Sequence, residues 1–502
     1  MSAELLPTPR SERDTAPREP RSTRARSRRA AARSATGSTQ PVAAGPLDGR
    51  AARNLVLALA LSGFLEWLGA GSILPLLPLY VRQRGGSDAL VGFIMAAFFL
   101  ASLVVQYPTG RVSDRIGRRP IQLAGLAIYT VGSLAFLALA TPGAAIAFRG
   151  LQGAGAGMVQ VASAALVGDA VPSRWQGRAY GALYGGQTAG LAIGPLLASI
   201  LGTGSMRIVF LAAAVGAVLA AVPLLAFVPR GRLVRPGAVP RRGRPRSTQR
   251  PWRQRAVVGV VVAMVASGLA SGTYEVCWSL LLHFRGAASW QIGLSWTLFA
   301  SPFVLLSLPA GWLVDRLDRR YLAVAAILGS ATFAVVYPFL RSVAWLIGLG
   351  AVEAATVAVG YPAVMAQLTH SVDPSVQGEA QGFAAAAQTA AIALAALGAG
   401  ALFGIHPWVP FVTAAGAMVV LAGGVGLLWR GVPGGAGDRP RRPTDRGGDV
   451  TAPDRPHAGP AGQEPARLGD AAGPAWGLEE ARSGARSRRE SDEQGSMATE
   501  EA

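Results

Sequence analysis

Three carboxylates lie inside long apolar stretches of this chain: Glu66, Glu275 and Glu353. An ionised side chain inside a membrane costs about 3 kcal/mol on insertion scales, so such residues usually mark the pathway of an ion or substrate. Burial favours the neutral form of a carboxyl group, which suits a site that exchanges protons. The alternative is a structural hydrogen bond from a permanently protonated glutamate. We expect proton exchange first at Glu66, near the middle of its stretch, then at Glu353, and last at Glu275.

Aromatic residues flank two of these acids in the sequence: Phe64 and Trp67 near the first, Tyr274 and Trp278 near the second. An acid beside aromatic faces suits a lipophilic cation, by charge and by cation–π attraction. The alternative is that these aromatic residues anchor helices at the membrane interface.

The elements that must position these residues are apolar runs of about 20 residues, the length that crosses a bilayer as a helix. The chain is 51% hydrophobic and 15% charged. Only ten of its 28 acidic residues lie between residues 54 and 429, far fewer than a soluble domain of that size carries. The sequence therefore predicts an all-α membrane protein with twelve transmembrane helices, near 54–81, 88–109, 121–140, 144–168, 177–201, 206–228, 256–283, 290–313, 321–340, 343–369, 376–404 and 408–429.

The second half of the sequence repeats the first at a constant offset of 201 residues. The segment GRVSDRIGRR at 110–119 returns as GWLVDRLDRR at 311–320. The same offset places Glu353 at the repeat position of Gln152. A duplicated set of spans predicts two pseudo-symmetric six-helix bundles with a pathway between them.

The arginines predict the orientation of the spans. Loop 110–120 holds four arginines, loop 229–255 holds ten with no acid, and loop 314–320 holds three, whereas the alternate loops hold two at most. Because cytoplasmic loops carry the excess of arginine, both termini and the long central loop are expected in the cytoplasm. The predicted organisation is a disordered Arg-rich tail at 1–53, bundles at 54–228 and 256–430, a basic linker at 229–255 and a second disordered tail at 431–502.

The loop Gly110-x-x-x-Asp114-Arg115-x-Gly117-Arg118-Arg119 resembles the signature loop between spans two and three of the major facilitator superfamily. The resemblance implies a gate, in which small Gly110 allows close helix approach and Asp114 faces the positive end of a neighbouring helix. Arg118 would then bind Asp169, and the other arginines would reach carboxylates and lipid phosphates. The gate-loop candidates are Gly110, Asp114, Arg115, Arg118, Arg119, Asp169, Gly311, Asp315, Arg316 and Arg319.

The second copy of this loop departs from the pattern. Asp318 stands where the first copy has Gly117, and His370 occupies the repeat position of Asp169. We therefore expect the gate-loop interactions of the second half to be weaker than those of the first, or to involve different residues.

Two further motifs carry the resemblance. Arg149-x-x-Gln152-Gly153 resembles the family's second motif, whose arginine is implicated in proton coupling, and positions i and i+3 share a helix face. The alternative is an arginine that snorkels to the outer interface.

The segment Gly181-(x8)-Gly190-(x3)-Gly194-Pro195 resembles the antiporter motif of drug:proton exchangers, although Ala198 and Ser199 replace its closing glycines. Such glycines imply a kinkable helix face that packs tightly on a neighbour.

Several function classes are excluded by what the sequence lacks. It holds no phosphate-binding glycine loop and no constellation typical of catalysis, a metal or a cofactor, and Cys277 is its only cysteine. The net charge of +19 lies in the tails and connections without any nucleic-acid motif, so no nucleic-acid partner is expected.

The resemblance, which covers residues 54–430, implies alternating access driven by the proton gradient. We expect a non-enzymatic, proton-coupled exporter of small lipophilic or drug-like molecules, monomeric and integral to the cell membrane. Its partners would be a small-molecule substrate, protons and membrane lipid. The alternatives are an exporter of one metabolite such as a sugar or an amino acid, a proton-symporting importer, and a non-transporting membrane scaffold or sensor.

The topology leads to a first prediction. A cysteine placed at Pro240 in a chain without Cys277 should react with a membrane-impermeant reagent only after the cells are opened, because loop 229–255 is expected in the cytoplasm. Labelling of residue 240 from outside intact cells would overturn the assignment.

Overall fold

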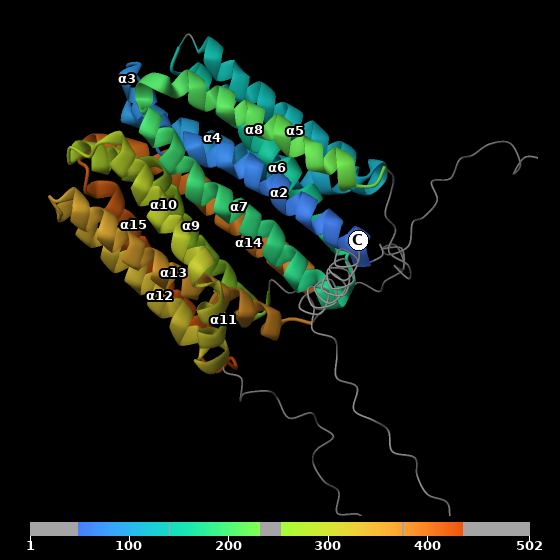
Figure 1. The fold of residues 1–502 in the computed structure, drawn as a ribbon. Coiled ribbons are helices and arrows are strands. Elements are labelled where there is room, and N and C mark those ends of the chain that lie inside the picture. The colour runs from blue at the N-terminus through green and yellow to red at the C-terminus, as the bar shows by residue number, and fades with distance from the viewer. Residues whose placement is uncertain (1–48, 140, 231–252, 374–375, 435–502) are drawn as a thin grey trace, which may run out of the picture. The chain divides into compact units, whose positions relative to one another are not determined.

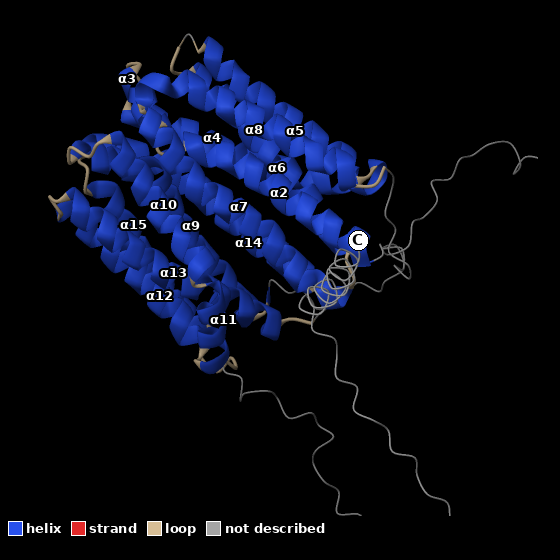
Figure 2. Ribbon diagram, viewed as in Figure 1, coloured by secondary structure: helices blue, strands red, loops and turns tan. Residues whose placement is uncertain are grey.

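The computed structural model describes residues 49–139, 141–230, 253–373 and 376–434, and the regular structure of this part of the chain is entirely helical (Figure 2). The predicted tails and central linker fall largely outside these residues. The N-terminal half contributes α2 (Gly49–Ile73), α3 (Leu77–Gln83), α4 (Asp88–Ile116), α5 (Arg118–Ala135), α6 (Ala144–Ala170), α7 (Ser173–Leu201) and α8 (Met206–Phe227). The C-terminal half contributes α9 (Arg255–Phe284), α10 (Ser289–Leu305), α11 (Ser307–Arg316), α12 (Arg319–Val336), α13 (Val343–Ser371), α14 (Gln377–Ile405) and α15 (Val409–Leu428). Single 3₁₀ turns include η1 (Phe136–Ala138) and η4 (Tyr337–Phe339).

Ten helical segments of the described chain are long and apolar enough to cross a membrane, counting α2 and α3 as one segment. The pair α10 and α11 would make an eleventh, but it is bent by 59°. Helix α7 is not among the ten, because its glycines and polar residues dilute its apolar side chains. The described residues thus form the all-helical part of an integral membrane protein, and the count of twelve spans stays a prediction.

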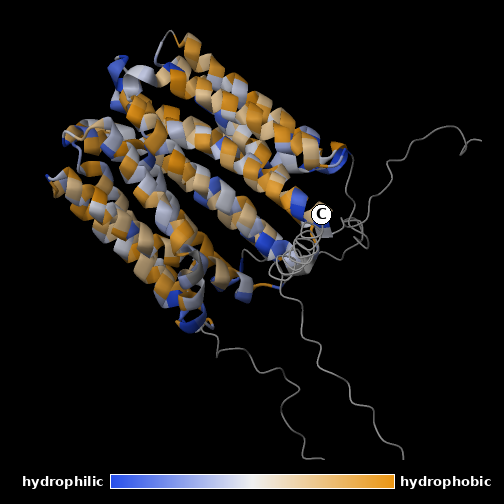
Figure 3. Cartoon of the chain, in the orientation of Figure 1, coloured by the Kyte–Doolittle hydropathy of each residue, from blue (hydrophilic) through white to orange (hydrophobic). Residues whose placement is uncertain are grey.

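Large apolar side chains on the outer faces of these helices are exposed, as expected where lipid is the solvent. Val104, Leu394 and Val420 are 71%, 65% and 74% exposed. Figure 3 shows apolar residues along most of the helix lengths and hydrophilic residues gathered mainly near helix ends.

The duplication is visible in how corresponding helices end. Gly85 and Gly286, which are 201 residues apart, adopt positive φ angles of 82° and 81° just after α3 and α9. The arginine before each glycine then reaches a backbone carbonyl near the end of the third predicted span of its half. Arg84 donates to Leu139 O at 3.2 Å, and Arg285 donates to Pro338 O.

Helix α7 lies against α2 through glycines spaced four residues apart. There is no room for a Cβ atom at Gly186, Gly190 or Gly194, because each faces a backbone carbonyl of α2. This close approach is what small residues allow between membrane helices. Gly181 lies in open space and does not join this contact, so the expectation that it would share the packed face is wrong in this conformation.

The corresponding pair in the C-terminal half, α9 and α14, packs with the glycines on the other helix. Gly268 and Gly272 of α9 face the carbonyls of Gln388 and Ile392 on α14. The proline of the motif, Pro195, has no counterpart in α14, where residue 396 is alanine. The pseudo-symmetric positions thus keep close packing with different residues.

The two halves touch through α4 with α14 and through α7 with α10, and α7 and α14 lie centrally in the bundle (Figure 1). Gly92 lies against the carbonyl of Ala396, and Gly400 lies against that of Asp88. In the second contact Thr297 Oγ1 donates to Ala192 O at 2.6 Å.

The opposite ends of α7 and α14 make no such contact. Gly177, Gly181, Gly378 and Gly382 all have open space where a Cβ atom would stand. The close glycine contacts between the halves that the structure describes therefore lie near one end, the end that the arginine pattern predicts to be outside.

Gly400 provides a test of this one-sided contact. Gly400→Leu should hold the halves apart at this end, because its side chain would collide with the backbone of Asp88, whereas Gly398→Leu should be tolerated since Gly398 faces open space. With Cys277 replaced by serine, spin labels at Arg207→Cys and Ile405→Cys should move apart in the Gly400 variant only. Equal label distances in both variants would contradict the contact.

Candidate functional site

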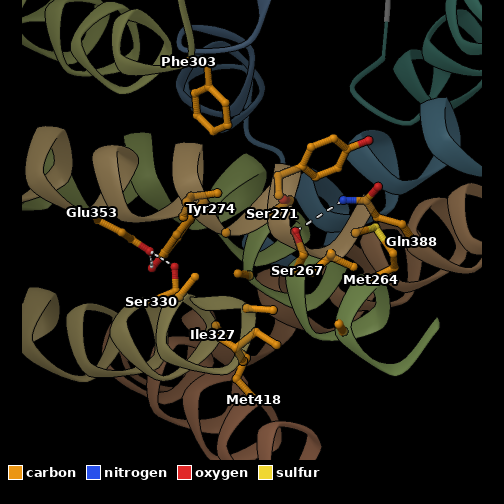
Figure 4. A pocket seen from close by; sticks show the side chains of 18 of the residues that line it. Met264, Ser267, Ser271, Tyr274, Phe303, Ile327, Ser330, Glu353, Gln388 and Met418 are labelled. Atoms are coloured by element: carbon orange, nitrogen blue, oxygen red, sulfur yellow. Dashed lines mark hydrogen bonds between the residues drawn. The ribbon is translucent and has the colours of Figure 1, made fainter. Parts of the chain in front are cut away.

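A cavity with a volume of about 480 Å³ lies mainly within the C-terminal half (Figure 4). Only Trp67 of α2 and Leu191 of α7 come from the N-terminal half. The remaining walls come from α9, α10, α12, α13, α14 and α15. Most lining residues are apolar or aromatic, and Glu353 is the only acidic or basic residue among them.

Three hydroxyl groups surround the carboxylate of Glu353, which is 1% exposed as a residue. Ser330 Oγ lies 2.6 Å and Tyr274 Oη 3.0 Å from Glu353 Oε1, and Tyr337 Oη lies 2.7 Å from Oε2. These donors come from α12, α9 and η4, so three separate segments position one acid of α13. Figure 4 shows Glu353, Tyr274 and Ser330 gathered at one side of the cavity.

Ser330 and Tyr337 are not among the site residues predicted from the sequence. Their spacing could have indicated them, because two residues seven positions apart lie on the same face of a helix, two turns from each other. A serine and a tyrosine at that spacing in an apolar run can serve one polar partner.

Of the four aromatic residues predicted beside the acids, three line this cavity or an adjoining pocket and one lines neither. Trp67 and Tyr274 line the cavity, and Trp278 lines a small adjoining pocket in which its ring centroid lies 4.9 Å from that of Tyr337. Phe64 lines neither of these two pockets. The missed aromatic lining residues are Phe299, Phe303 and Tyr361.

The acids flanked by these aromatic residues in the sequence do not share the cavity. Glu66 and Glu275 are absent from its walls, although Trp67 and Tyr274 are present. Neighbouring residues of a helix point about 100° apart, so adjacency in sequence did not place acid and ring on one face. The association of Tyr274 with Glu275 is therefore corrected to an association with Glu353.

Glu66 is enclosed in the N-terminal half. It is 2% exposed, and its Oε2 atom has no hydrogen-bond partner among the described residues. It lies on α2 one helical turn from Ser62 and Gly63, and Gly63 faces the Gln187 side chain of α7. A buried carboxyl without donors is held most favourably in its neutral form.

Arg149 and Gln152 share one face of α6, as their spacing predicts. Arg149 Nη1 donates to Gln152 Oε1 at 2.9 Å, and Gln152 Nε2 donates to Ser133 Oγ at 2.9 Å. The guanidinium carbon of Arg149 also lies 4.5 Å from the ring centroid of Phe98. Arg149 is 1% exposed, so it does not snorkel to the interface in this conformation.

Glu275 lies on the other half of the molecule but close enough to Arg149 for the two charges to interact. Its Oε2 atom is buried and has no hydrogen-bond partner among the described residues. This is an electrostatic link between α6 and α9 that the sequence spacing did not indicate.

In the first gate loop Arg118 lies between two carboxylates. Its Nη2 atom is 2.6 Å from Asp114 Oδ1, and its Nε atom is 2.8 Å from Asp169 Oδ2. Ser113 Oγ accepts a further hydrogen bond from Nη1. Gly117, with a φ of 102°, makes the sharp break between α4 and α5 that brings Arg118 back over this site.

Two expectations about the gate loops need correction. A Cβ atom at Gly110 would lie 4.0 Å from Val161 Cγ1 of α6 and one at Gly311 would face open space, so neither glycine allows an unusually close helix approach. Arg119, 8% exposed, reaches neither a carboxylate nor the surface. It donates instead to Val228 O and Leu225 O, each at 2.9 Å, and so satisfies carbonyls at the end of α8.

The second gate loop also uses an arginine to satisfy carbonyls after a helix end, and there the arginine has an additional carboxylate partner. Arg320, the repeat equivalent of Arg119, donates to Val432 O beyond α15 and pairs with Asp318 at 2.6 Å. The hydrogen bond from the Arg320 side chain holds the pKa of the Asp318 carboxyl below its usual value. Asp318, which replaces a glycine of the first copy, thus positions an arginine. Of the other candidates, Arg316 stacks on Trp312 at 4.2 Å, and Arg319 N donates to Gly434 O at 3.1 Å.

The two loops should differ in their sensitivity to charge removal. Asp114→Asn should reduce transport on the order of tenfold, because it takes one carboxylate from Arg118. Asp315→Asn should have a smaller effect, since the second loop is held by Asp318 and Arg320. Initial transport rates at matched expression measure both. Wild-type transport by Asp114→Asn would remove the gate hypothesis.

Comparison with known proteins identifies a matching family and similar relatives. The model of the Major Facilitator Superfamily matches residues 59–284 and 256–476. Quinolone resistance protein NorA of Staphylococcus aureus (strain MRSA252) is 23% identical over 376 residues, which cover 73% of this chain and 93% of the relative. Inner membrane transport protein YajR of Escherichia coli (strain K12) is 34% identical over 145 residues, 28% of this chain and 31% of the relative.

Two solved structures share the fold. The nucleoside transporter NupG is 14% identical with a TM-score of 0.60, covering 75% of this chain and 99% of that chain. The human organic anion transporter MFSD10 is 20% identical with a TM-score of 0.57, covering 74% and 99%. With the family model matching most of its length, and with the helices and loops described above, this chain belongs to the Major Facilitator Superfamily.

Proposed function

We propose that this chain is a proton-coupled exporter of small lipophilic molecules, including cations. The observation that carries the proposal is the cavity of about 480 Å³, in which aromatic and apolar walls enclose one acid. Pockets of this size hold a drug-sized molecule, and their few polar groups set its orientation. The similarity to a quinolone resistance protein over 73% of this chain supports export of drug-like compounds.

The contacts between the halves support a transport cycle of alternating access. In our proposal there are twelve spans in two bundles, at 54–228 and 256–430, with both termini in the cytoplasm. The halves then touch at the outside through Gly92, Gly400 and the α7–α10 contact, and no such glycine contact is described between their cytoplasmic ends. This arrangement would correspond to an inward-facing state that can accept substrate from the cell.

We propose Glu66 as the group that carries the proton. The Oε2 atom of its buried carboxyl has no hydrogen-bond donor among the described residues, so a change in its surroundings during the cycle can decide whether it holds a proton. Arg149 and Gln152 would link this half to Glu275 on the other half, because the charges of Arg149 and Glu275 interact. The ion pairs of Arg118 with Asp114 and Asp169 would hold the first gate loop in place and so stabilise one state of the transport cycle.

The second candidate is an exporter of one polar metabolite. It is favoured by a polar wall of the same cavity, in which Gln388 Nε2 lies 3.3 Å from Ser267 Oγ and Ser271 is close by (Figure 4). A sugar or nucleoside would need such groups to replace its hydrogen bonds to water.

Toxicity profiling separates these candidates. The full chain would be expressed in a host that lacks its major efflux pumps, and growth would be measured against chemically diverse compounds. A lipophilic exporter should raise tolerance to several unrelated lipophilic compounds and lose this effect when the proton gradient is collapsed. Protection against a single polar metabolite, or against none, would contradict the proposal.

A glutamine at position 66 tests the proton carrier. Glu66→Gln resembles the protonated form, so it should lower proton-driven export to the level of cells without the protein while substrate binding is retained. Glu379→Gln is the matched control, because Glu379 is an exposed acid at the start of α14. If Glu66→Gln exports with an unchanged pH dependence, the proton carrier is not Glu66.

A further inference from the structure

In the first half, an ion pair joins the gate loop to α6. Arg118 at the start of α5 lies 2.8 Å from Asp169 near the end of α6, measured from Nε to Oδ2. The corresponding helices of the second half are α12 and α13, and the residue at the repeat position of Asp169 is His370. Histidine offers no carboxylate, so the second gate loop cannot be joined to α13 in the same way.

The chain that follows α15 makes this connection with its backbone, and we call residues 429–434 the strap. Pro433 O accepts a hydrogen bond from Gln367 Nε2 of α13 at 3.0 Å. The next carbonyl, Gly434 O, accepts one at 3.1 Å from the backbone N–H of Arg319, the first residue of α12. Two consecutive carbonyls thus join the end of α13 to the start of α12, as the ion pair of the first half joins α6 to α5.

Further contacts hold the beginning and middle of the strap. The indole of Trp429, which is 1% exposed, donates to Ala256 O of α9 at 3.1 Å. Arg320 Nη1 donates to Val432 O, and Asp318 keeps the Arg320 side chain in place through an ion pair of 2.6 Å. The strap therefore contacts α9, α12 and α13, which are three separate helices of the second half.

The end of the strap fits closely against the gate loop. A Cβ atom at Gly434 would collide with Asp318 Oδ1 and Arg320 Nε, so this position has no room for a side chain. Gln367, which donates to the strap, is completely buried. A buried amide is costly to leave without a partner, so this side chain favours the docked position of the strap.

We propose that the strap takes the place of the missing carboxylate: it fastens the second gate loop to α13 and makes the position of this loop depend on the segment that leads into the C-terminal tail. The part of the loop in transport rests on the proposed function, but the docking of the strap does not. Residues 435–502 continue directly from the strap. A partner that bound the chain close to Gly434 would therefore compete with the contacts of the gate loop.

Spin labels on the gate loop and on α13 test the proposal. In a chain with Cys277→Ser, labels at Leu317→Cys and Thr369→Cys occupy exposed positions and report the distance between the two elements. This chain should give a single narrow distance distribution. Gly434→Val should replace it by a broad one, because the added side chain cannot fit beside the gate loop. The matched control is Gly426→Val near the end of α15, which faces open space and should leave the distribution narrow.

Two shortened chains test the strap without a substitution in it. A chain that ends at Ala436 keeps the strap and should give the narrow distribution of the full chain. A chain that ends at Gly431 lacks the carbonyls that reach α12 and α13, so it should give the broad one. Labels at Arg207→Cys and Ile405→Cys, placed in separate samples, should show the same distance at the opposite end of the bundle in both chains, which shows that both are folded.

A milder variant removes a single donor. Gln367→Leu takes away the hydrogen bond to Pro433 O and leaves the strap itself intact, so it should broaden the distribution less than Gly434→Val does. The same variants should lower the initial rate of transport in the same order, with Gly434→Val reduced on the order of tenfold.

Four results would overturn the inference. The gate-loop distance could be unchanged in the chain that ends at Gly431, or unchanged in Gln367→Leu. It could be disturbed equally in the chain that ends at Ala436. The labels at the opposite end could also move in the chain that ends at Gly431, which would mean that the strap holds the whole bundle and not the gate loop. Failure of the proposed function looks different, because the distances would then change as expected while neither the variants nor the wild type exported any compound.

Discussion

A carboxylate inside an apolar helix bundle is stable only if nearby groups donate hydrogen bonds to it, if a positive charge lies close, or if it takes up a proton. The described part of this chain surrounds its three glutamates inside apolar stretches in three different ways. Hydroxyls from three segments meet at Glu353, Arg149 interacts with Glu275, and Glu66 lacks a donor for Oε2. The positions of α6, α9, α12 and α13 are tied to one another through these groups. In our account, the substrate cavity contains Glu353, and Glu66 carries the proton.

Close packing of helix backbones holds these groups at their positions. Membrane helices gain little from hydrophobic burial against one another, so association relies on contact at small residues. Gly190 and Gly194 bring α7 onto α2, which carries Glu66, and Gly268 and Gly272 bring α9 onto α14. The same kind of contact joins the halves at Gly92 and Gly400. Since these contacts between halves occur near one end only, they can open without disturbing the packing inside each half.

The repeat made much of the fold predictable. Apolar runs indicated where the helices lie, and the 201-residue offset paired features that the structure keeps, such as Gly85 with Gly286. The spacing of Arg149 and Gln152 correctly placed them on one helix face. The resemblance of the loops indicated the family, which the matching family model confirms.

What the sequence could not supply was the direction of each side chain between helices. Tyr274 stands next to Glu275 in the chain but reaches Glu353, 79 residues away, and Trp67 enters a cavity from which Glu66 is absent. The bend between α10 and α11 has no counterpart in α4, although Pro108 of α4 and Pro309 of α11 occupy the same position of the repeat. Asp318 replaces a glycine of the gate-loop motif, and this replacement suggested that the motif was lost in the second half. In the structure, however, Asp318 pairs with Arg320 and holds its side chain in place. Such features depend on contacts between distant segments, which a periodic pattern does not encode.

The central claim is that export of a cation is coupled to the entry of protons, and proteoliposomes test it most directly. Purified protein would be reconstituted with a pH gradient, acidic inside and without a membrane potential, and a pH-sensitive dye would report the gradient when the lipophilic cation tetraphenylphosphonium is added outside. The account predicts that the cation accumulates inside and that the gradient falls faster than in liposomes holding Glu66→Gln. Accumulation of the cation with no change in the gradient would contradict proton coupling.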